Sequence, residues 1–318
     1  MFSSLVGQQQ AVELLTQSVK QNRVAPAYMF VGAEGVGRSL AARCFIELLF
    51  SSSVKPDQIP ILQNRIRQRN HPALLWVEPT YQYQGQRLTP AEAAEKGVKR
   101  KAPPVIRLEQ IREITQFLSR PPLEAERNVI VLEQAETMAE SAANALLKTL
   151  EEPGKATLIL IAPSPESVLP TLVSRCQKIP FYRLDTTAMT QVLTQTGNAE
   201  ILQHPEVLNI AAGSPGNAIS SYQQLQNIPS EFIAQVKKTP TSYRHALELA
   251  KKIDKELDTE AQLWLIDYLQ QYYWQQIHEP KIIQQLEKTR KHLLCYAQPR
   301  LVWECTFLDL FQISQISH

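Results

Sequence analysis

The sequence predicts an α/β domain with a parallel sheet, followed by a region that is all α-helical. Apolar runs typical of buried strands alternate with amphipathic helix patterns as far as residue 184, as in parallel sheets that helices cover on both faces. Beyond Leu184 only helical patterns continue. Because 318 residues exceed the length of one typical domain, we expect three units, at residues 1–184, 185–223 and 224–318.

The first elements surround a glycine-rich stretch. Apolar spacing predicts a helix at 8–21, a strand at 27–31 and a second helix at 40–50. Between this strand and the second helix, residues 32–39 read Gly-Ala-Glu-Gly-Val-Gly-Arg-Ser. The stretch matches the phosphate-binding pattern G-x-x-x-x-G-K-[ST], except that Arg38 stands in place of the lysine.

The residue types of this stretch indicate a nucleotide site that has lost activity. Gly32, Gly35 and Gly37 allow backbone N–H groups to turn toward a phosphate, at the positive end of the following helix. Ser39 is placed to hold Mg²⁺, whereas the planar fork of Arg38 does not replace the compact charge of a lysine. We therefore expect no hydrolysis here, and weak or structural binding of ATP or ADP stays open.

The region after the second helix contains one strand and one exposed insertion. Residues 51–70 read as a polar segment, residues 73–77 as a short strand and residues 81–104 as the insertion. The basic residues of the insertion are Arg87, Lys96, Lys99, Arg100 and Lys101. A solvated loop is the simpler interpretation of this cluster, and a contact with a nucleic-acid backbone is the alternative.

A carboxylate is expected at the end of a buried strand. Residues 129–132 are apolar and mostly β-branched, and helices are expected before and after them, at 108–118 and 141–152. The strand leads to Glu133, whose charge suits a metal contact. Gln134 follows where an ATPase needs a carboxylate, and its neutral amide cannot act as a general base.

The composition excludes several classes of protein. A net charge of +2 gives no large field of one sign. The four cysteines are Cys44, Cys176, Cys295 and Cys305. They form no C-x-x-C pair, which argues against a zinc ribbon or redox motif and is typical of a reducing compartment. Since neither a basic leader nor a membrane-length apolar run is present, we expect a cytoplasmic protein without a membrane segment.

The C-terminal region is predicted to be helical from residue 185 onward. A turn is expected at residues 213–217, inside a small helical unit. Further on, one broad apolar face combines Leu265, Tyr268, Leu269, Tyr272 and Tyr273, with Trp264 and Trp274 nearby. Such a face is typical of a core or of a subunit contact, so we expect an oligomerisation domain at 224–318.

Four motifs are specific enough to compare with known families. They are Val6-Gly7-Gln8, Ala27-Tyr28-Met29-Phe30, the run from Asn144 to Pro153, and Ser174-Arg175-Cys176. Together they resemble motifs of the bacterial clamp-loader subunits of the AAA+ superfamily. The resemblance implies an AAA+ P-loop domain, a helical lid and a C-terminal helical collar in the three expected units. Within that family the chain looks most like a non-hydrolysing subunit rather than the ATP-hydrolysing gamma or tau subunit.

Two further positions depart from the ATPase pattern of this family. Active members end the strand that is expected here at 157–162 in polar threonines, whereas this chain has Ala162 and Pro163, which offer no side-chain hydrogen bond. The family's Gly-Ser-x-Arg places an arginine of the lid on the nucleotide, whereas this chain reads Gly-Ser-Pro-Gly at 213–216. The resemblance therefore implies a degenerate nucleotide site at Gly32, Gly35, Gly37, Arg38, Ser39 and Glu133.

The triplet around Arg175, in contrast, is intact. It resembles the arginine finger that one clamp-loader subunit points into the nucleotide site of the next. An arginine supplied in this way accelerates other nucleotide hydrolases by about 10³ to 10⁵. We expect Arg175 to have this role, the alternative being a structural surface arginine, and Cys176 to be a packing residue rather than a nucleophile.

The resemblance also implies partners and cofactors. The partners would be gamma or tau subunits, the delta subunit and, through the complex, the sliding clamp and primed DNA. No cofactor is expected to be required, and no zinc, because residues 51–70 lack the four cysteines that many relatives insert before His71-Pro72. Two alternatives stay open: an ATP-hydrolysing subunit that uses Arg38 and Glu133, and a DNA-binding module built on residues 87–101.

Overall fold

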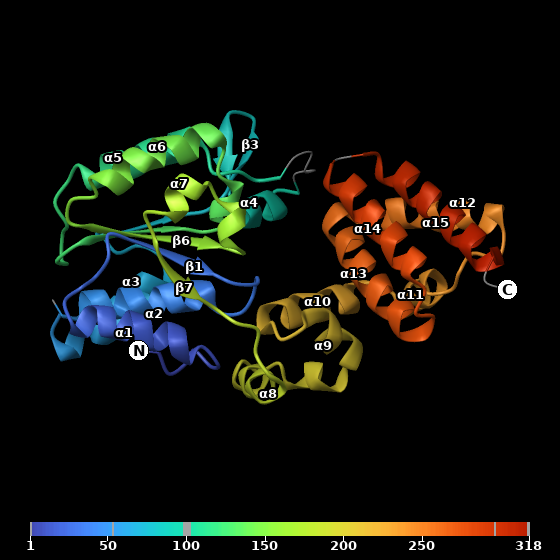
Figure 1. Ribbon diagram of the computed structural model, residues 1–318, viewed down its shortest axis with the longest axis horizontal. Helices are drawn as coiled ribbons and strands as arrows, with labels where there is room; N and C mark the ends of the chain where they lie inside the picture. The colour runs from blue at the N-terminus through green and yellow to red at the C-terminus, as the bar shows by residue number, and fades with distance from the viewer. Residues whose placement is uncertain (1, 53, 98–102, 296, 317–318) are drawn as a thin grey trace. The chain divides into compact units, whose positions relative to one another are not determined.

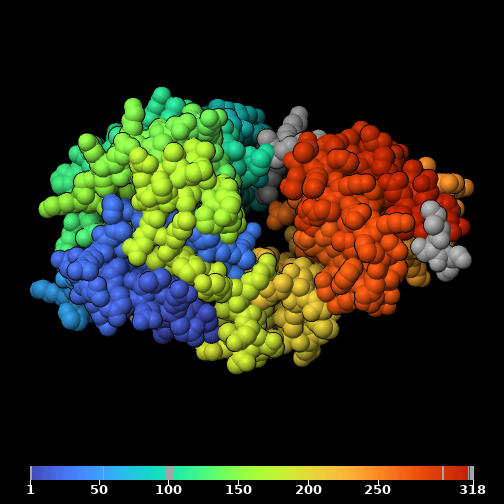
Figure 2. All heavy atoms as spheres, viewed as in Figure 1, coloured from blue at the N-terminus to red at the C-terminus, as the bar shows by residue number. Residues whose placement is uncertain are grey.

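The computed structural model describes residues 2–52, 54–97, 103–295 and 297–316. The chain divides into two compact units, Met1–Ala188 and Met189–His318. The blue-to-green atoms in Figure 2 belong to the first unit, and the orange-to-red atoms to the second unit. An α/β unit followed by an all-helical unit confirms the predicted fold class. The finer division into three domains, with boundaries after residues 184 and 223, stays a prediction.

The first unit is built on a five-stranded parallel sheet in the order β2-β5-β6-β1-β7. The strands are β1 (Ala27–Val31), β2 (Leu74–Val77), β5 (Asn128–Leu132), β6 (Ala156–Ala162) and β7 (Gln177–Pro180). Every residue of β5 and β6 is buried, as expected of strands that are covered on both faces. β1 pairs with both β6 and β7 and is therefore an interior strand of the sheet. The glycine-rich stretch begins at the carboxyl end of this strand.

Helices cover both faces of this sheet (Figure 1). One face carries α1 (Gln9–Lys20), α2 (Arg38–Ser51) and α3 (Ile59–Arg67), and the other carries α5 (Leu108–Leu118), α6 (Glu140–Glu151) and α7 (Pro170–Val173). Side chains of β1 point alternately to the two faces of the sheet. Tyr28 and Phe30 therefore pack in one hydrophobic core, whereas Met29 packs in the other. The helices predicted at 8–21, 40–50, 108–118 and 141–152 are confirmed within a few residues.

The polar segment predicted at 51–70 in fact contains helix α3. Leu62 and Ile66 of this helix are buried, and their spacing of four residues places them on one face. Pro60 lies within the first two positions of the helix, where its missing N–H costs no helical hydrogen bond. The sequence interpretation was wrong here because two prolines and many polar residues masked a short apolar stripe.

Residues 81–97 of the insertion are more ordered than a solvated loop. They contain an antiparallel hairpin of β3 (Tyr81–Tyr83) and β4 (Gln86–Leu88), followed by α4 (Pro90–Glu95). Gln84 and Gly85 both have positive φ, as the two central residues of a type I′ hairpin turn require. Arg87 pairs with Glu113 of α5. Lys96 of the cluster is the C-cap residue of α4, whereas Lys99, Arg100 and Lys101 lie outside the described residues.

The second unit consists of helices. They are α8 (Thr186–Gln195), which begins just before the unit, α9 (Pro205–Ala211), α10 (Pro215–Asn227), α11 (Ser230–Val236), α12 (Tyr243–Glu256), α13 (Thr259–Gln276), α14 (Pro280–Leu294) and α15 (Pro299–Ile316). The described residues also contain four short 3₁₀ helices: η1 (Pro56–Gln58), η2 (Ala135–Thr137) and η3 (Pro165–Ser167) in the first unit, and η4 (Ala199–Gln203) in the second.

The aromatic face predicted on α13 lies mostly in the core of this unit. Leu265, Leu269 and Tyr273 are buried there, beside Trp303 of α15. Trp274, in contrast, is 49% exposed.

Across the described residues, no helix combines the length and the apolarity that crossing a membrane would require.

Candidate functional site

The glycine-rich stretch connects the carboxyl end of β1 to the first turn of α2. Gly37 is the N-cap residue of α2, with φ of 103°, a conformation that glycine adopts without strain. Gly32 lies against the strand partner, because a Cβ atom added there would meet the carbonyl oxygen of Phe181 at 2.3 Å. Its N–H donates to the carbonyl of Ala162 at 3.4 Å. The loop therefore keeps a tight turn whose first N–H is directed at β6.

Arg38 opens helix α2 and is surrounded by carboxylates of the same unit. Burial lowers the pKa of its guanidinium, and Glu136, Glu34 and Glu133 partly offset that effect. Its Nη1 is buried and hydrogen-bonds to no described residue. Burial in turn raises the pKa of Glu136. The guanidinium thus sits among negative charges of the protein itself, in the position where the phosphate-binding pattern has lysine.

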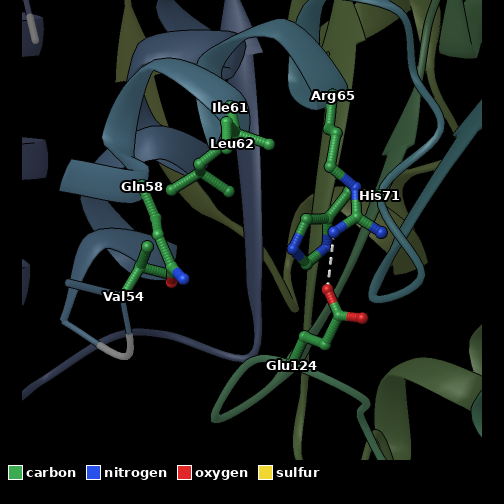
Figure 3. A pocket seen from close by; sticks show the side chains of 7 residues that line it. All are labelled: Val54, Gln58, Ile61, Leu62, Arg65, His71 and Glu124. Atoms are coloured by element: carbon green, nitrogen blue, oxygen red, sulfur yellow. Dashed lines mark hydrogen bonds and ion pairs between the residues drawn. The ribbon is translucent and has the colours of Figure 1, made fainter.

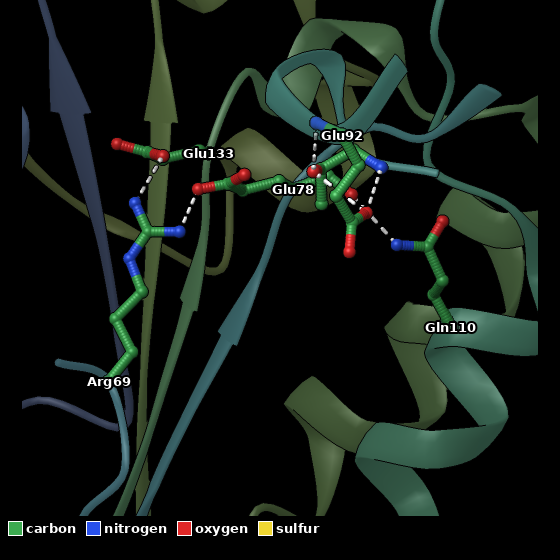
Figure 4. Close-up of polar contacts among 6 residues, drawn as sticks. Arg69, Glu78, Glu92, Gln110 and Glu133 are labelled. Carbon is green, nitrogen blue, oxygen red and sulfur yellow. Dashed lines mark hydrogen bonds and ion pairs between the residues drawn. The ribbon is translucent and has the colours of Figure 1, made fainter. Parts of the chain in front are cut away.

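Glu133, the expected metal ligand, is paired with an arginine. Its carboxylate Oε2 lies 3.5 Å from Nη2 of Arg69, whose Nη1 pairs with Glu78 (Figure 4). The same guanidinium lies over the ring of Trp76, with Cζ 4.7 Å from the centroid. Gln134, next along the chain, is exposed and adopts a left-handed conformation at the start of η2. A cation supplied by the protein therefore stands where a magnesium ion would need this carboxylate.

The lid motif at residues 213–216 forms the start of a helix in the second unit. Ser214 is the N-cap residue of α10, and its Oγ accepts a hydrogen bond from the backbone N–H of Asn217 at 3.2 Å. Pro215 occupies the first turn, where proline is favoured. The residues of this motif thus serve a helix cap, and Gly216 carries no side chain where the family pattern has arginine.

Arg175 lies on the surface, between α7 and β7. Its side chain is 40% exposed and forms an ion pair with Glu151, with 2.9 Å between Nη2 and Oε1. Its Nη1 donates to the carbonyl oxygen of Thr171 at 3.1 Å. Cys176, the next residue, packs against the hydrophobic core to which α5 and α6 contribute, and burial raises the pKa of its thiol to about 11. The thiol is therefore protonated at neutral pH, as expected of a packing residue.

One residue that reasoning from chemistry did not single out ties the glycine-rich stretch in place. The side chain of Gln8 is buried and donates to the carbonyl oxygens of Val36 at 3.2 Å and of Tyr182 at 2.7 Å. Its Oε1 accepts from the N–H of Tyr182 at 3.0 Å. The signal available was the motif Val6-Gly7-Gln8. Arg69 carried no signal, because nothing in the sequence links it to Glu133.

His71 lies in a loop, as expected, but its side chain is buried. Its ring stacks on Phe50 with 4.6 Å between centroids, and Nδ1 accepts a hydrogen bond from the backbone N–H of Ala73 at 3.2 Å. It borders a hollow of about 420 Å³ in which Arg65 pairs with Glu124 (Figure 3). No group of three or more His, Cys, Asp or Glu in the described parts of the chain is arranged to hold a metal ion. The absence of zinc stays a prediction.

Comparison with known families covers both units. The sequence pattern of the family described as "DNA polymerase III, delta subunit" matches residues 7–185, more than half of the chain. The pattern described as "Cyanobacterial DNA polymerase III delta prime, C-terminal domain" matches residues 187–310. The two matches follow one another along the chain and together account for nearly all of it.

Two sequence relatives are named as subunits of DNA polymerase III. The chain is 30% identical over 191 residues to DNA polymerase III subunit delta′ of Bacillus subtilis, covering 59% of this chain and 51% of that protein. It is 24% identical over 238 residues to subunit tau of the same organism, covering 73% of this chain and 39% of that protein. The chain thus spans about half or less of the length of these relatives. A solved gamma subunit-related protein of Thermotoga maritima aligns with 95% of this chain and 99% of its own, at 15% identity and a TM-score of 0.49.

Proposed function

The chain belongs to the delta prime family of DNA polymerase III clamp-loader subunits, and from this membership we propose that it is a non-hydrolysing subunit that supplies Arg175 to a neighbour's nucleotide site. Its task would be to support ATP turnover in the neighbouring subunit while the loader places a sliding clamp on primed DNA. Such a chain acts in the cytoplasm, where bacterial DNA is replicated.

The observation that carries this proposal is the ion pair between Arg69 and Glu133. Hydrolysis in a site of this kind needs a carboxylate that holds Mg²⁺ and a base that orients water. Glu133 already pairs with Arg69, and the neighbouring Gln134 has no basic oxygen to offer. Arg38, the third altered group, lies among carboxylates that repel a triphosphate. These contacts support a site that does not turn over ATP by itself.

Arg175 supports the second half of the proposal. An arginine that acts in trans must reach a neighbour, so its guanidinium must lie at the surface on a firmly built support. Arg175 is 40% exposed and lies two residues after the end of α7, a helix whose Leu172 is fully buried. The guanidinium offers several N–H donors in a planar fork that suits phosphate oxygens.

The experiment combines this chain with gamma or tau and delta subunits, in an assembly whose other nucleotide sites are inactivated. Arg175→Ala is expected to lower ATP turnover at the neighbouring site by about 10³-fold, with the assembly intact by size-exclusion chromatography. Arg112→Ala, which removes an exposed arginine of α5, is the control and should leave turnover unchanged. Equal turnover in both variants would refute the arginine-finger role.

The second candidate is an ATP-hydrolysing subunit, favoured by the similarity to subunit tau over 73% of this chain. In that case Arg38 would act on the phosphates in place of lysine. The isolated chain distinguishes the two functions, because a non-hydrolysing subunit shows no ATP turnover above a protein-free blank. Turnover that Arg38→Ala removes would establish the second candidate instead.

A further inference from the structure

A carboxylate of the same unit holds Arg175, and this contact suggests regulation of the proposed finger. Nη2 of Arg175 lies 2.9 Å from Oε1 of Glu151, the last residue of α6. From this geometry we infer that Glu151 is a latch, which must release the guanidinium of Arg175 before that group reaches a triphosphate of a neighbour. The inference rests on the proposed function and names its regulation.

The carboxylate of Glu151 and a phosphate of the neighbour compete for the positive charge of the same guanidinium. A guanidinium that is paired with a carboxylate is locally neutralised, whereas a γ-phosphoryl group in transfer is stabilised by an uncompensated positive charge. The N–H of Nη2 that points at Glu151 is not available to a phosphate oxygen until this contact breaks. Release of Glu151 is therefore a step before catalysis, and its free energy adds to the barrier of hydrolysis.

The position of Glu151 in its helix supports a pairing role. The C-terminal end of a helix carries partial negative charge, so a carboxylate in the last turn is repelled by the helix dipole. Glu151 ends α6, and the helix itself therefore gives no reason for an acidic residue there. The positive charge of Arg175 offsets this repulsion. The ion pair with Arg175, and not the helix, therefore accounts for a carboxylate at this position.

A second contact keeps the arm of Arg175 in place when the latch opens. Nη1 donates to the carbonyl oxygen of Thr171 at 3.1 Å, four residues earlier in the chain. This acceptor lies on α7 and is independent of Glu151. Loss of the carboxylate contact therefore frees Nη2 while Nη1 still orients the guanidinium. The latch is also weak, because the two side chains are 40% and 55% exposed to water.

The test uses the assembled loader with one competent neighbouring site, at saturating concentrations of this chain. Glu151→Gln is expected to raise ATP turnover by about two- to five-fold, the range that an exposed ion pair allows. Salt screens such a pair, so the excess over the parent protein should shrink as ionic strength rises. Glu152→Gln is the matched control, since Glu152 forms no ion pair with a described residue and its change removes one charge at nearly the same place.

The outcomes separate the latch from the finger. A rise for Glu151→Gln but not for Glu152→Gln supports the latch. Unchanged or lower turnover for Glu151→Gln, while Arg175→Ala still abolishes turnover, overturns the latch and leaves the finger intact. An equal rise in both glutamate variants also overturns it, because the effect would then come from the local field alone. If Arg175→Ala changes nothing, the proposed function and the latch fail together.

Discussion

Nη2 of Arg69 lies 3.5 Å from Oε2 of Glu133, although the two residues are far apart in the sequence. Arg69 adopts a left-handed conformation with φ of 59°, after the end of α3. This turn directs its side chain across the carboxyl ends of β2 and β5, where it also pairs with Glu78 (Figure 4). Glu133, the carboxylate that we expect a metal to need in an active ATPase, is thus already paired with a cation of the protein.

We predict that Arg69→Met lowers the free energy of unfolding by about 1 to 3 kcal/mol. The substitution leaves Glu78 and Glu133 without their cation, and their side chains are only 23% and 19% exposed. It also removes the stacking of a cation on Trp76. Urea unfolding followed by tryptophan fluorescence measures the change.

The control for this prediction is Arg87→Met. Arg87 is about as exposed as Arg69, but its partner Glu113 is 52% exposed, so water solvates the carboxylate that remains. We expect a loss below about 1 kcal/mol. A loss for Arg69→Met no larger than for this control would show that the cluster around Glu133 adds nothing to stability.

Gly32→Ala is predicted to destabilise the first unit by about 3 kcal/mol. The added Cβ would meet the carbonyl oxygen of Phe181 at 2.3 Å, and neither backbone segment can move without disturbing the pairing of β1 with β7. Gly85→Ala is the control, because φ there is +79° and no atom lies within 4 Å of an added Cβ. Its loss should be about 1 kcal/mol. Equal losses in urea unfolding would rule out the steric explanation for Gly32.

Much of the fold could be predicted from the sequence because its strands are buried on both faces. Runs such as 129–132 are uninterrupted and apolar, so both their type and their limits are clear. Helix α3 and the hairpin of β3 and β4 were not predicted. Their apolar residues are few and their surroundings polar, and the hairpin turn at Gln84-Gly85 is a weaker signal than Asn-Gly or Asp-Gly.

The candidate site was predictable only where its residues adjoin one another in the chain. Arg38 could be predicted from the glycine-rich stretch and from the strand directly before it. Glu133 could be predicted because it directly follows a buried strand. The partners of these residues were not predictable, since Arg69 reaches Glu133 only through the pairing of β2 with β5. In the same way, the contact of Arg175 with Glu151 depends on α6 and α7 packing together.

Gln8→Ala is predicted to lower the free energy of unfolding of the first unit by about 2 to 4 kcal/mol. Its amide makes three hydrogen bonds, to the carbonyls of Val36 and Tyr182 and from the N–H of Tyr182. Gln8 is 2% exposed, so water cannot replace these contacts without a cavity. Gln10→Ala, on the exposed side of α1, should change stability by less than about 0.5 kcal/mol. A small loss for both variants would show that the glycine-rich stretch holds its shape without Gln8.

His71 should make the first unit less stable as the pH falls. Burial, with a smaller effect of Arg65 that Glu124 opposes, lowers the pKa of this imidazole below its ordinary 6.5. In the unfolded chain the ring takes up a proton near pH 6.5, whereas in the folded unit it does so only at a lower pH and until then keeps accepting from the N–H of Ala73. Stability is therefore complete above that pH and falls below it, by at most about 1.4 kcal/mol per pH unit.

His71→Asn is expected to remove this dependence, because an amide oxygen still accepts from the N–H of Ala73 but does not titrate. The variant loses the ring stacking on Phe50 and is less stable at every pH. Between about pH 7.5 and about pH 5.5, however, its unfolding free energy should change less than that of the parent, by at most about 1.4 kcal/mol. His292→Asn, at an exposed position of α14, is the control and should keep the parental slope for the first unit. If His71→Asn keeps the parental dependence of the unfolding free energy on pH, that dependence comes from other groups.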